Sequence, residues 1–188
     1  MGLRLRFLAL ILSSLWSDRL KATDDSVLKF RVLPNDVDVF SVTNDRFAAL
    51  MDLGKMDVIL RAGAFWKMVW QRWTPVLVYS DIQFGEALRL LESYHLRSRL
   101  LFWRGRFFWF EHRFERDGSV VATGITKSAM LGKNGLVPAE DIIEATHEPV
   151  SSPSAPPIVK RLRKVEERRR KRRAEINREM AAQSDGCR

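Results

Sequence analysis

The sequence predicts an α+β domain in which one long helix packs on a curved antiparallel sheet. Three observations predict it: an early strand-like alternation, an amphipathic stripe over residues 44–62, and four strand-like segments that follow one another across short connections. A helix laid on a sheet buries the apolar surface of both elements. With 188 residues, 46% of them apolar, the chain is long enough to build such a core.

The first strand is predicted over VLKFRVLP, residues 27–34. Charged Lys29 and Arg31 alternate there with apolar Leu28, Phe30 and Val32. A period of two residues is typical of a strand with one buried face.

The helix is predicted over residues 44–62, where apolar residues recur at helical spacing. The stripe consists of Phe47, Leu50, Met51, Gly54, Val58 and Ala62. Gly63 then supplies a stop, because glycine adopts the left-handed conformation that ends many helices. At the start, Thr43, Asn44 and Asp45 each qualify as an N-cap or first-turn residue.

Four further strands are predicted after the helix. They occupy residues 73–84, 94–103, 107–115 and 119–131. The short turn Arg104-Gly105-Arg106 separates the second from the third, and Asp117-Gly118, a strong hairpin signal, separates the third from the fourth. Consecutive strands joined by such short turns predict an antiparallel meander.

Residues 3–16, LRLRFLALILSSLW, predict an N-terminal apolar helix. The apolar run has about ten residues, whereas a bilayer span needs roughly 20. Trp16, Ser17, Asp18 and Arg19 follow it and make a poor cleavage context for a secretory signal. Two interpretations fit equally well: an amphipathic helix lying in a membrane interface, and a helix buried against its own domain or a partner.

The C-terminal part predicts a linker followed by a basic helical arm. SSPSAPP interrupts any helix, and the 23 residues from Ile158 to Met180 then carry 11 Lys/Arg against 4 Asp/Glu. This arm therefore holds +7 of the net charge of +9. Its charge suits RNA, anionic lipid or an acidic partner. It has no aromatic residue to stack on bases, so we do not expect nucleic acid as the partner. A solvated charged tail explains it as well.

These features divide the chain into four predicted segments. They are an apolar segment at 1–25, the folded domain at 26–148, a Pro/Ser linker at 149–157 and a basic helical tail at 158–188.

The composition excludes several classes of protein. The only cysteine, Cys187, excludes a disulfide framework and suits a reducing compartment. His95, His112 and His147 lack metal-ligand spacing. We therefore expect neither a metal nor a cofactor, and a cytoplasmic protein that is free or peripheral to a membrane.

Several ordered landmarks between residues 27 and 143 resemble the hotdog-fold acyl-CoA thioesterases. The nearest branch is similar to bacterial thioesterase-like proteins related to vertebrate thioesterase superfamily member 6, and the 4-hydroxybenzoyl-CoA thioesterases are more distant. The residues that carry the likeness are VLKFRVLPNDVDV, NDRFAALMDLGKMDVILRAG, WTPVLVYSDIQF, LRSRLLFWRGRFFWFEHRF, SVVATGITKSAML and GLVPAEDI. The resemblance implies a sheet wrapped around the central helix, a homodimer or a dimer of dimers, and an acyl-CoA or other acyl thioester as substrate.

The resemblance also implies a reaction centre at the helix start. There the helix dipole and unpaired backbone N–H groups stabilise the oxyanion formed from the thioester carbonyl. An aspartate on the approach acts as nucleophile or as general base for water. The pattern of this branch, D-x-D-x-N-x-H-M-N-N-x-R-Y, makes Asp38 and Asn44 the catalytic residues. The residues implied in substrate binding are Ser41, Thr43, Asp45, Arg46 and Phe47.

This chain departs from that pattern in a loop that is one residue shorter. The family histidine falls on Ser41 and the first asparagine on Thr43, and serine cannot exchange a proton near neutral pH as imidazole does. From the residues alone, Asp38 is a loop residue bonded to nearby backbone, and Asp36 is a solvated residue at the strand end. Two functions stay open: thioester hydrolysis, and a hotdog domain without hydrolysis that serves as a binding or structural subunit.

Aromatic and basic clusters leave further alternatives. The aromatic residues of 102–110 form core or interface, or line an acyl tunnel. Phe65, Trp66, Trp70 and Trp73 form a lid or a membrane-contacting patch. The arginines at 97, 99, 104 and 106 bind CoA phosphates or occupy a solvated strand face.

Overall fold

A computed structural model of the chain describes residues 3–14, 16–38 and 40–185, with the backbone alone for 181–185. Cys187 and the last residues of the predicted tail lie outside this part. The chain forms two compact units, Met1–Pro153 and Ser154–Arg188.

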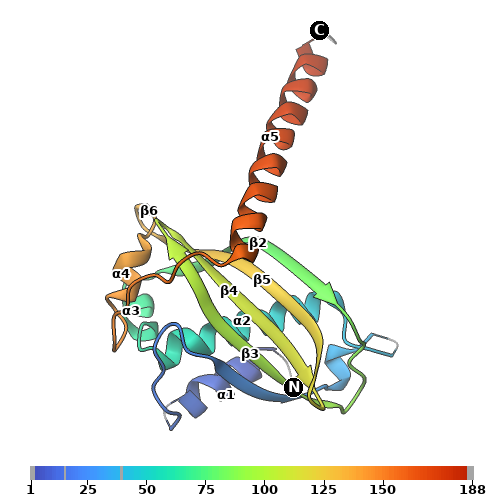
Figure 1. The fold of residues 1–188 in the computed structure, drawn as a ribbon, viewed down its shortest axis with the longest axis vertical. Coiled ribbons are helices and arrows are strands. Elements are labelled where there is room, and N and C mark those ends of the chain that lie inside the picture. Colours follow the sequence, from blue (N-terminus) through green and yellow to red (C-terminus); the bar gives the residue numbers. More distant parts are fainter. Residues whose placement is uncertain (1–2, 15, 39, 186–188) are drawn as a thin grey trace. The chain divides into compact units, whose positions relative to one another are not determined.

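The first unit is a strongly curved antiparallel sheet wrapped around one long helix (Figure 1), which confirms the predicted α+β hotdog fold. Its strands are β1 (Ser26–Arg31), β2 (Thr74–Phe84), β3 (Ser93–Arg104), β4 (Phe107–Arg116), β5 (Ser119–Gly132) and β6 (Gly135–Leu136). The order is β1-β3-β4-β5-β2, with β6 paired to β5. The sheet therefore ends at β2, an 11-residue strand that pairs only with β5 along this path.

Helix α2 (Asn44–Arg61) lies across the concave face of the sheet. It buries the predicted stripe, with Leu50 and Met51 each only 1% exposed. Gly54 allows the closest approach, because a Cβ at that position would lie 2.1 Å from the hydroxyl oxygen of Ser98 on β3. Gly63 follows the helix at φ +91°, which confirms the predicted stop.

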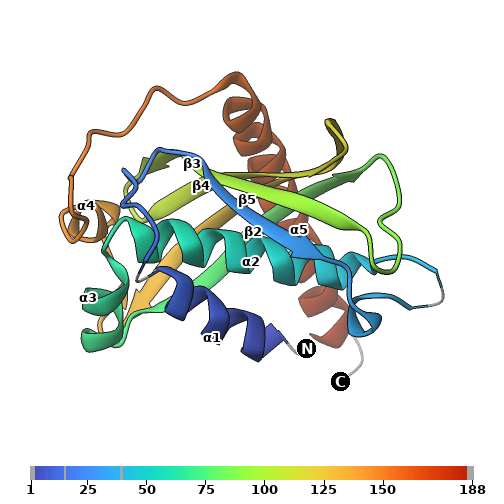
Figure 2. The ribbon, with the colours of Figure 1, turned by 90° about the horizontal axis from the view of Figure 1, so that it is seen from below.

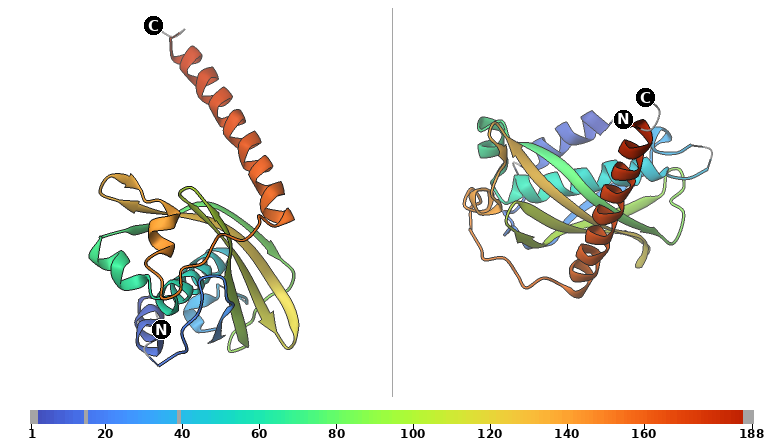
Figure 3. Two further views of the ribbon diagram at one scale, coloured as in Figure 1. Left: turned by 60° about the vertical axis from the view of Figure 1, so that its left-hand side comes forward. Right: turned by 90° about the horizontal axis from the view of Figure 1, so that it is seen from above.

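Three shorter helices surround α2. They are α1 (Leu3–Ser14), α3 (Phe65–Trp70) and α4 (Ala139–Ile143). Figure 2 shows α2 between the sheet and α1, with α3 beyond the end of α2, and Figure 3 gives two further views. Phe7 of α1 meets Phe65 of α3 edge to face, with 6.4 Å between ring centroids. The N-terminal helix therefore packs on its own domain, as one of the two interpretations expected.

Short elements were not predicted. They are α3, α4, β6 and a 3-10 turn at Pro34–Asp36. Each is six residues or fewer, which is too short for a periodic pattern to emerge. Helix α2 and strands β2 to β5 begin and end within one residue of their predicted limits, whereas β1 ends at Arg31, three residues before its predicted end at Pro34.

The second unit contains one helix, α5 (Pro157–Asp185), which is 29 residues long. Proline occupies its first position, where no backbone N–H is needed. Its basic side chains include six in succession at 168–173. Within the described ranges, none of the helices has the length and apolar character that a membrane span requires.

Candidate functional site

The candidate site is a small closed loop that leads into α2. Val37 and Val42 form an isolated antiparallel bridge, and the Asp38 N–H donates to the Ser41 carbonyl at 3.3 Å. The Thr43 N–H donates to the Asp36 carbonyl at 3.2 Å, which closes the loop at its base. The chain therefore turns back on itself and starts α2 at Asn44.

The prediction that Asp36 is solvated was wrong. Its side chain is buried, 3% exposed, and forms an ion pair with the guanidinium of Arg6 on α1. The Leu33 N–H donates to the same carboxylate at 2.9 Å. Asp36 is buried because α1, 30 residues earlier in the chain, brings a cation to it.

Asp38, in contrast, has an exposed side chain in the bend of the loop. Asn44 is also exposed, at the first position of α2. The structure therefore assigns different environments to the two aspartates: one carboxylate is committed to an internal ion pair, and the other faces solvent.

The other predicted site residues lie around the same corner. Thr43 is the N-cap in an extended conformation, and no bond from its side chain to the helix backbone forms there. Its hydroxyl instead bonds the Asp45 carboxylate, which lowers the pKa of Asp45. Ser41 is half-buried in an isolated bridge to Arg89. Arg46 is half-buried beside Asp45, at 4.0 Å.

Phe47 belongs to the core of the domain. It is 3% exposed, and its ring lies 4.8 Å from that of Phe114 and 5.2 Å from that of Phe84, between centroids. The contact with Phe84 joins the first turn of α2 to the end of the edge strand β2.

A cavity of about 170 Å³ lies under the C-terminal half of α2. Its lining is mainly apolar and includes Val58, Leu100, Phe108, Phe110, Met130 and Ile142. Part of the predicted aromatic cluster therefore does face a hollow. Pro75, Val76 and Leu77, at the start of β2, also line it.

One ion pair breaks the apolar lining of this cavity. Lys55 on α2 pairs with Asp52 at 2.6 Å and donates to the Ser128 hydroxyl at 3.3 Å. The Lys55 side chain is 10% exposed, whereas that of Asp52 is 60% exposed. The cavity therefore combines an apolar wall with one charged pair that reaches solvent.

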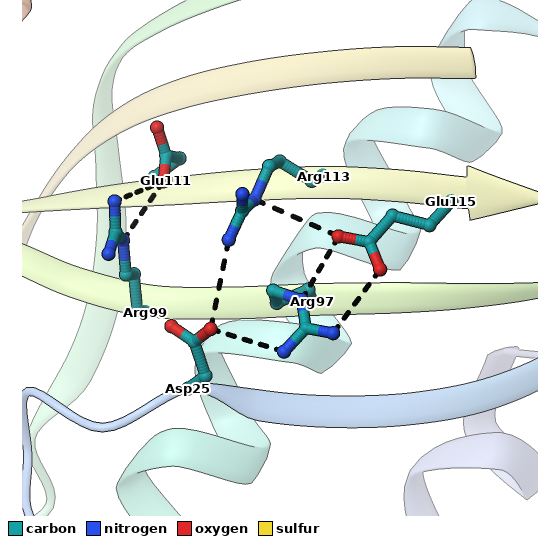
Figure 4. A network of polar contacts seen from close by, with 6 residues as sticks. All are labelled: Asp25, Arg97, Arg99, Glu111, Arg113 and Glu115. Atoms are coloured by element: carbon teal, nitrogen blue, oxygen red, sulfur yellow. Dashed lines mark hydrogen bonds and ion pairs between the residues drawn. The ribbon is translucent and has the colours of Figure 1, made fainter. Parts of the chain in front are cut away.

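Two of the four arginines considered for CoA phosphates have carboxylate partners on the outer face of the sheet. Arg97 bonds both Glu115 at 3.0 Å and Asp25 at 3.2 Å, and Arg99 bonds Glu111 at 2.8 Å. Arg113 joins the same network (Figure 4). These groups hold neighbouring strands together, whereas Arg104 and Arg106 are exposed around the β3–β4 turn.

A polar chain crosses the sheet beneath α2. Ser98 and Thr126 contact the two ring nitrogens of His112, at 2.9 Å and 3.1 Å. Burial lowers the pKa of His112 to about 3, so the imidazole is neutral at pH 7. Ser98 and His112 are both fully buried, so this serine–histidine contact has no access to a substrate.

Sequence reasoning missed Arg6, Lys55 and the Ser98–His112–Thr126 chain. Arg6 did leave a signal, because it lies on the helical face that also carries Phe7 and Leu10 and is therefore directed at the domain. A cation on an apolar face predicts a buried acidic partner. Nothing in the pattern identified Asp36 as that partner.

Comparison with known proteins agrees with the fold of the first unit. A family model described as the thioesterase-like superfamily matches residues 32–181, more than half of the chain. The chain therefore belongs to the thioesterase-like superfamily. Protein THEM6 from Xenopus laevis is 29% identical over 128 residues, which are 66% of this chain and 60% of that protein. The chain thus spans less than two thirds of the length of this relative.

Solved structures of the same fold include several thioesterases. A gentisyl-coenzyme A thioesterase is 21% identical with a TM-score of 0.58, covering 64% of this chain and 98% of the other. YbaW, a probable thioesterase from Escherichia coli, is 18% identical with a TM-score of 0.57, covering 65% and 98%. A mutant 4-hydroxybenzoyl CoA thioesterase complexed with 4-hydroxybenzoyl CoA is 13% identical with a TM-score of 0.57, covering 65% and 98%. At these identities the likeness establishes the fold.

Proposed function

We propose that this chain is an acyl-CoA thioesterase-like hydrolase in which Asp38 directs the attack and the start of α2 forms the oxyanion site. Membership of the thioesterase-like superfamily supports this class of reaction. The observation that carries the assignment of residues is the contrast between two neighbouring carboxylates. Asp36 is held by Arg6, whereas Asp38 is exposed in a loop that ends at the first turn of α2.

The proposed reaction uses the carboxylate and the helix end together. Asp38 accepts a proton from water as the water oxygen attacks the thioester carbon. The first N–H groups of a helix have no partner inside it, and they stabilise the oxyanion that forms. The carbon–sulfur bond then breaks, and the thiolate takes the proton back from Asp38. In the variant with Asp38 as nucleophile, water hydrolyses an acyl-enzyme anhydride in a second step.

The edge strand β2 supports a homodimer in this proposal. At this end of the sheet Leu77 is 52% exposed and Val78 is 44% exposed. An open edge strand of this length can pair with a strand of another chain. Antiparallel pairing of two copies about the middle of β2 brings Phe84 of one copy towards Thr74 of the other. Because Phe84 touches Phe47, the first turn of one α2 approaches the cavity mouth of the second copy.

The cavity then accommodates the acyl group. A cavity of about 150 Å³ lined by apolar side chains holds one benzene ring, and this one measures about 170 Å³. Short or aromatic acyl chains therefore fit it better than long ones. Asp38 from one copy and the cavity from the other complete one site.

A second function is favoured by one residue. Ser41 stands where the related branch has histidine, so the corner lacks an imidazole for proton exchange. In this alternative, the chain binds acyl-CoA without turnover and serves as a subunit of a larger assembly. Its basic tail, α5, makes the contact with an acidic partner.

The location that we propose is the cytoplasm, at the surface of a membrane. The outward side chains of α1 support the membrane contact: Leu5, Leu8 and Leu12 are each more than half exposed. Trp66 and Trp70 of α3 are 63% and 85% exposed, and tryptophan is enriched at membrane interfaces.

The first prediction concerns Asp38. We expect Asp38→Asn to lower kcat by roughly 100-fold or more, because the amide cannot accept the proton. The measurement is the release of CoA thiol from a panel of short, long and aromatic acyl-CoAs. Asp117→Asn is the matched control, since Asp117 is 94% exposed in the β4–β5 turn, and it should keep the rate of the unaltered chain.

Two results separate the two functions. Equal turnover by the Asp38→Asn and Asp117→Asn variants would exclude the proposed role of Asp38. No turnover of any acyl-CoA by the unaltered chain, together with saturable CoA binding in calorimetry, would instead support the binding subunit.

A further inference from the structure

We propose that Arg6 is a positioning residue for the loop that carries Asp38, so that α1 acts as a clamp on the candidate site. The effect on turnover rests on the proposed function. The clamp itself rests on the contacts of Arg6 with Asp36 and on those of Asp36 with Leu33 and Thr43.

Arg6 is fixed from several directions. Its Nη1 donates to Asp36 Oδ1 at 3.1 Å, and its Nη2 bonds both Asp36 Oδ2 and the Arg31 carbonyl, the latter at 3.2 Å. The guanidinium also lies 5.6 Å from the centre of the Phe30 ring. A planar guanidinium that meets both oxygens of a carboxylate fixes its orientation as well as its charge.

Asp36 passes this constraint to the loop. Its carboxylate accepts the Leu33 N–H, and its backbone carbonyl accepts the Thr43 N–H. One residue therefore joins α1 to the strand end before the loop and to the N-cap after it. Asp38 lies between these two anchors, two residues from Asp36.

Loss of Arg6 leaves a buried carboxylate without its cation. The side chain of Asp36 then moves towards water, because an unpaired charge is costly in a buried site. Movement of Asp36 disturbs its bond to Thr43, and with it the position of Asp38 relative to the start of α2. Rates are sensitive to such displacements, and a shift of about 1 Å can cost about 100-fold.

The same helix supplies a matched control. Arg4 is exposed on α1, so Arg4→Met removes one positive charge from this helix without touching Asp36. Arg6→Met removes the same charge together with the ion pair. Any difference between the two variants therefore reports the pairing with Asp36 and not the charge of α1.

The test measures two quantities on the full chain: the hydrogen-exchange rates of the loop amides and the turnover of acyl-CoA. In Arg6→Met we expect the amides of Asp38 and Thr43, which donate to the Ser41 and Asp36 carbonyls, to exchange hydrogen at least tenfold faster. We expect kcat to fall by roughly 10–100-fold and KM to change by less than about threefold, because the reacting geometry changes and not the cavity. Arg4→Met should match the unaltered chain in both measurements. Arg6→Lys keeps the charge but cannot bond both carboxylate oxygens as a guanidinium does. Its exchange rates and kcat should lie between those of Arg6→Met and Arg4→Met, and it replaces Arg6→Met if that variant does not fold.

The outcomes distinguish the clamp from the proposed function. Exchange and kcat that are the same in the Arg6 variants and in Arg4→Met would overturn the clamp while leaving hydrolysis intact. Faster loop exchange in a chain that hydrolyses no acyl-CoA at all would support the clamp and overturn the proposed function. A fall in kcat without any change in loop exchange would also overturn the clamp, since Arg6 would then act by another route.

Discussion

The buried side chain of His112 makes the stability of this fold depend on pH. Its two ring nitrogens are bonded across three strands, and burial lowers its pKa to about 3. In the unfolded chain the pKa of His112 is near 6.5. Below that pH the unfolded state therefore binds a proton that the folded state does not bind. The stability that the neutral imidazole provides is therefore complete above about pH 6.5 and is lost as the pH falls towards 3.

We accordingly expect the free energy of unfolding to fall by about 2 kcal/mol between pH 7.5 and pH 5 because of His112. Urea unfolding of the unaltered chain and of His112→Asn at both pH values isolates this contribution, since the carboxylates are common to both. The variant should be less stable at pH 7.5 by roughly 1–3 kcal/mol, because Ser98 or Thr126 loses its partner, and less sensitive to pH. A His112 ring that titrates near 6.5 in NMR would contradict this prediction.

The two aspartates mark the limit of sequence reasoning at the residue scale. Asp36 and Asp38 stand in the same DVD segment, and nothing local distinguishes them. The structure distinguishes them through Arg6, which is 30 residues away in the chain. The resemblance selected Asp38, and the contact with Arg6 gives an independent physical reason for that choice: a carboxylate already paired inside the core cannot serve a substrate.

At the scale of elements, the sequence predicted what local patterns can determine. The alternation in β1, the helical stripe of α2 and the Asp117-Gly118 turn each follow from neighbouring residues, and each was confirmed. The close approach of Gly54 to Ser98 and the cavity under α2 arise from packing between distant segments. No periodicity encodes those contacts, so the sequence left an acyl tunnel as one of two alternatives for the aromatic residues, and it did not predict the charged pair that lines the cavity.

Helix α1 has two faces in different environments. Its inner face directs Arg6 and Leu10 into the domain, whereas Leu5, Leu8 and Leu12 point outwards. The sequence left two interpretations of this segment open, and the structure shows that packing on the domain does not use the whole apolar surface. The outward leucines are available for a membrane interface.

We therefore expect the double variant Leu8→Gln/Leu12→Gln to bind anionic vesicles more weakly. With about 1 kcal/mol lost for each half-inserted leucine, the affinity should fall roughly 30-fold. Cosedimentation with phosphatidylcholine–phosphatidylglycerol vesicles measures it. Leu90→Gln/Val120→Gln changes two comparably exposed residues outside α1 and α3 and should bind as the unaltered chain does. Equal loss in both double variants would show that α1 is not the contact.

At the scale of the whole molecule, the distance between the parts of the proposed site is the main consideration. Asp38 precedes the first turn of α2, whereas the cavity lies under its second half, from Asp52 onwards. Asn44 and Asp52 are eight positions apart along the helix, and at 1.5 Å per residue this is about 12 Å. One chain alone therefore holds the carboxylate and the cavity apart. In the dimer that we propose, pairing along β2 would bring Asp38 of the second copy to the cavity mouth of the first.

Under this proposal, turnover depends on the dimer. Val78→Lys places two like charges at the paired edge, so we expect the dissociation constant measured by analytical ultracentrifugation to rise more than about tenfold. The turnover per chain should fall in proportion to the dimer that is lost, and it should recover as the protein concentration rises. Val120→Lys is the control, because Val120 is equally exposed but lies on β5, where it pairs with Glu115 of β4. A monomeric Val78→Lys variant with full turnover would show that one chain contains the complete site, and the cavity would then have to be reached by Asp38 of the same copy.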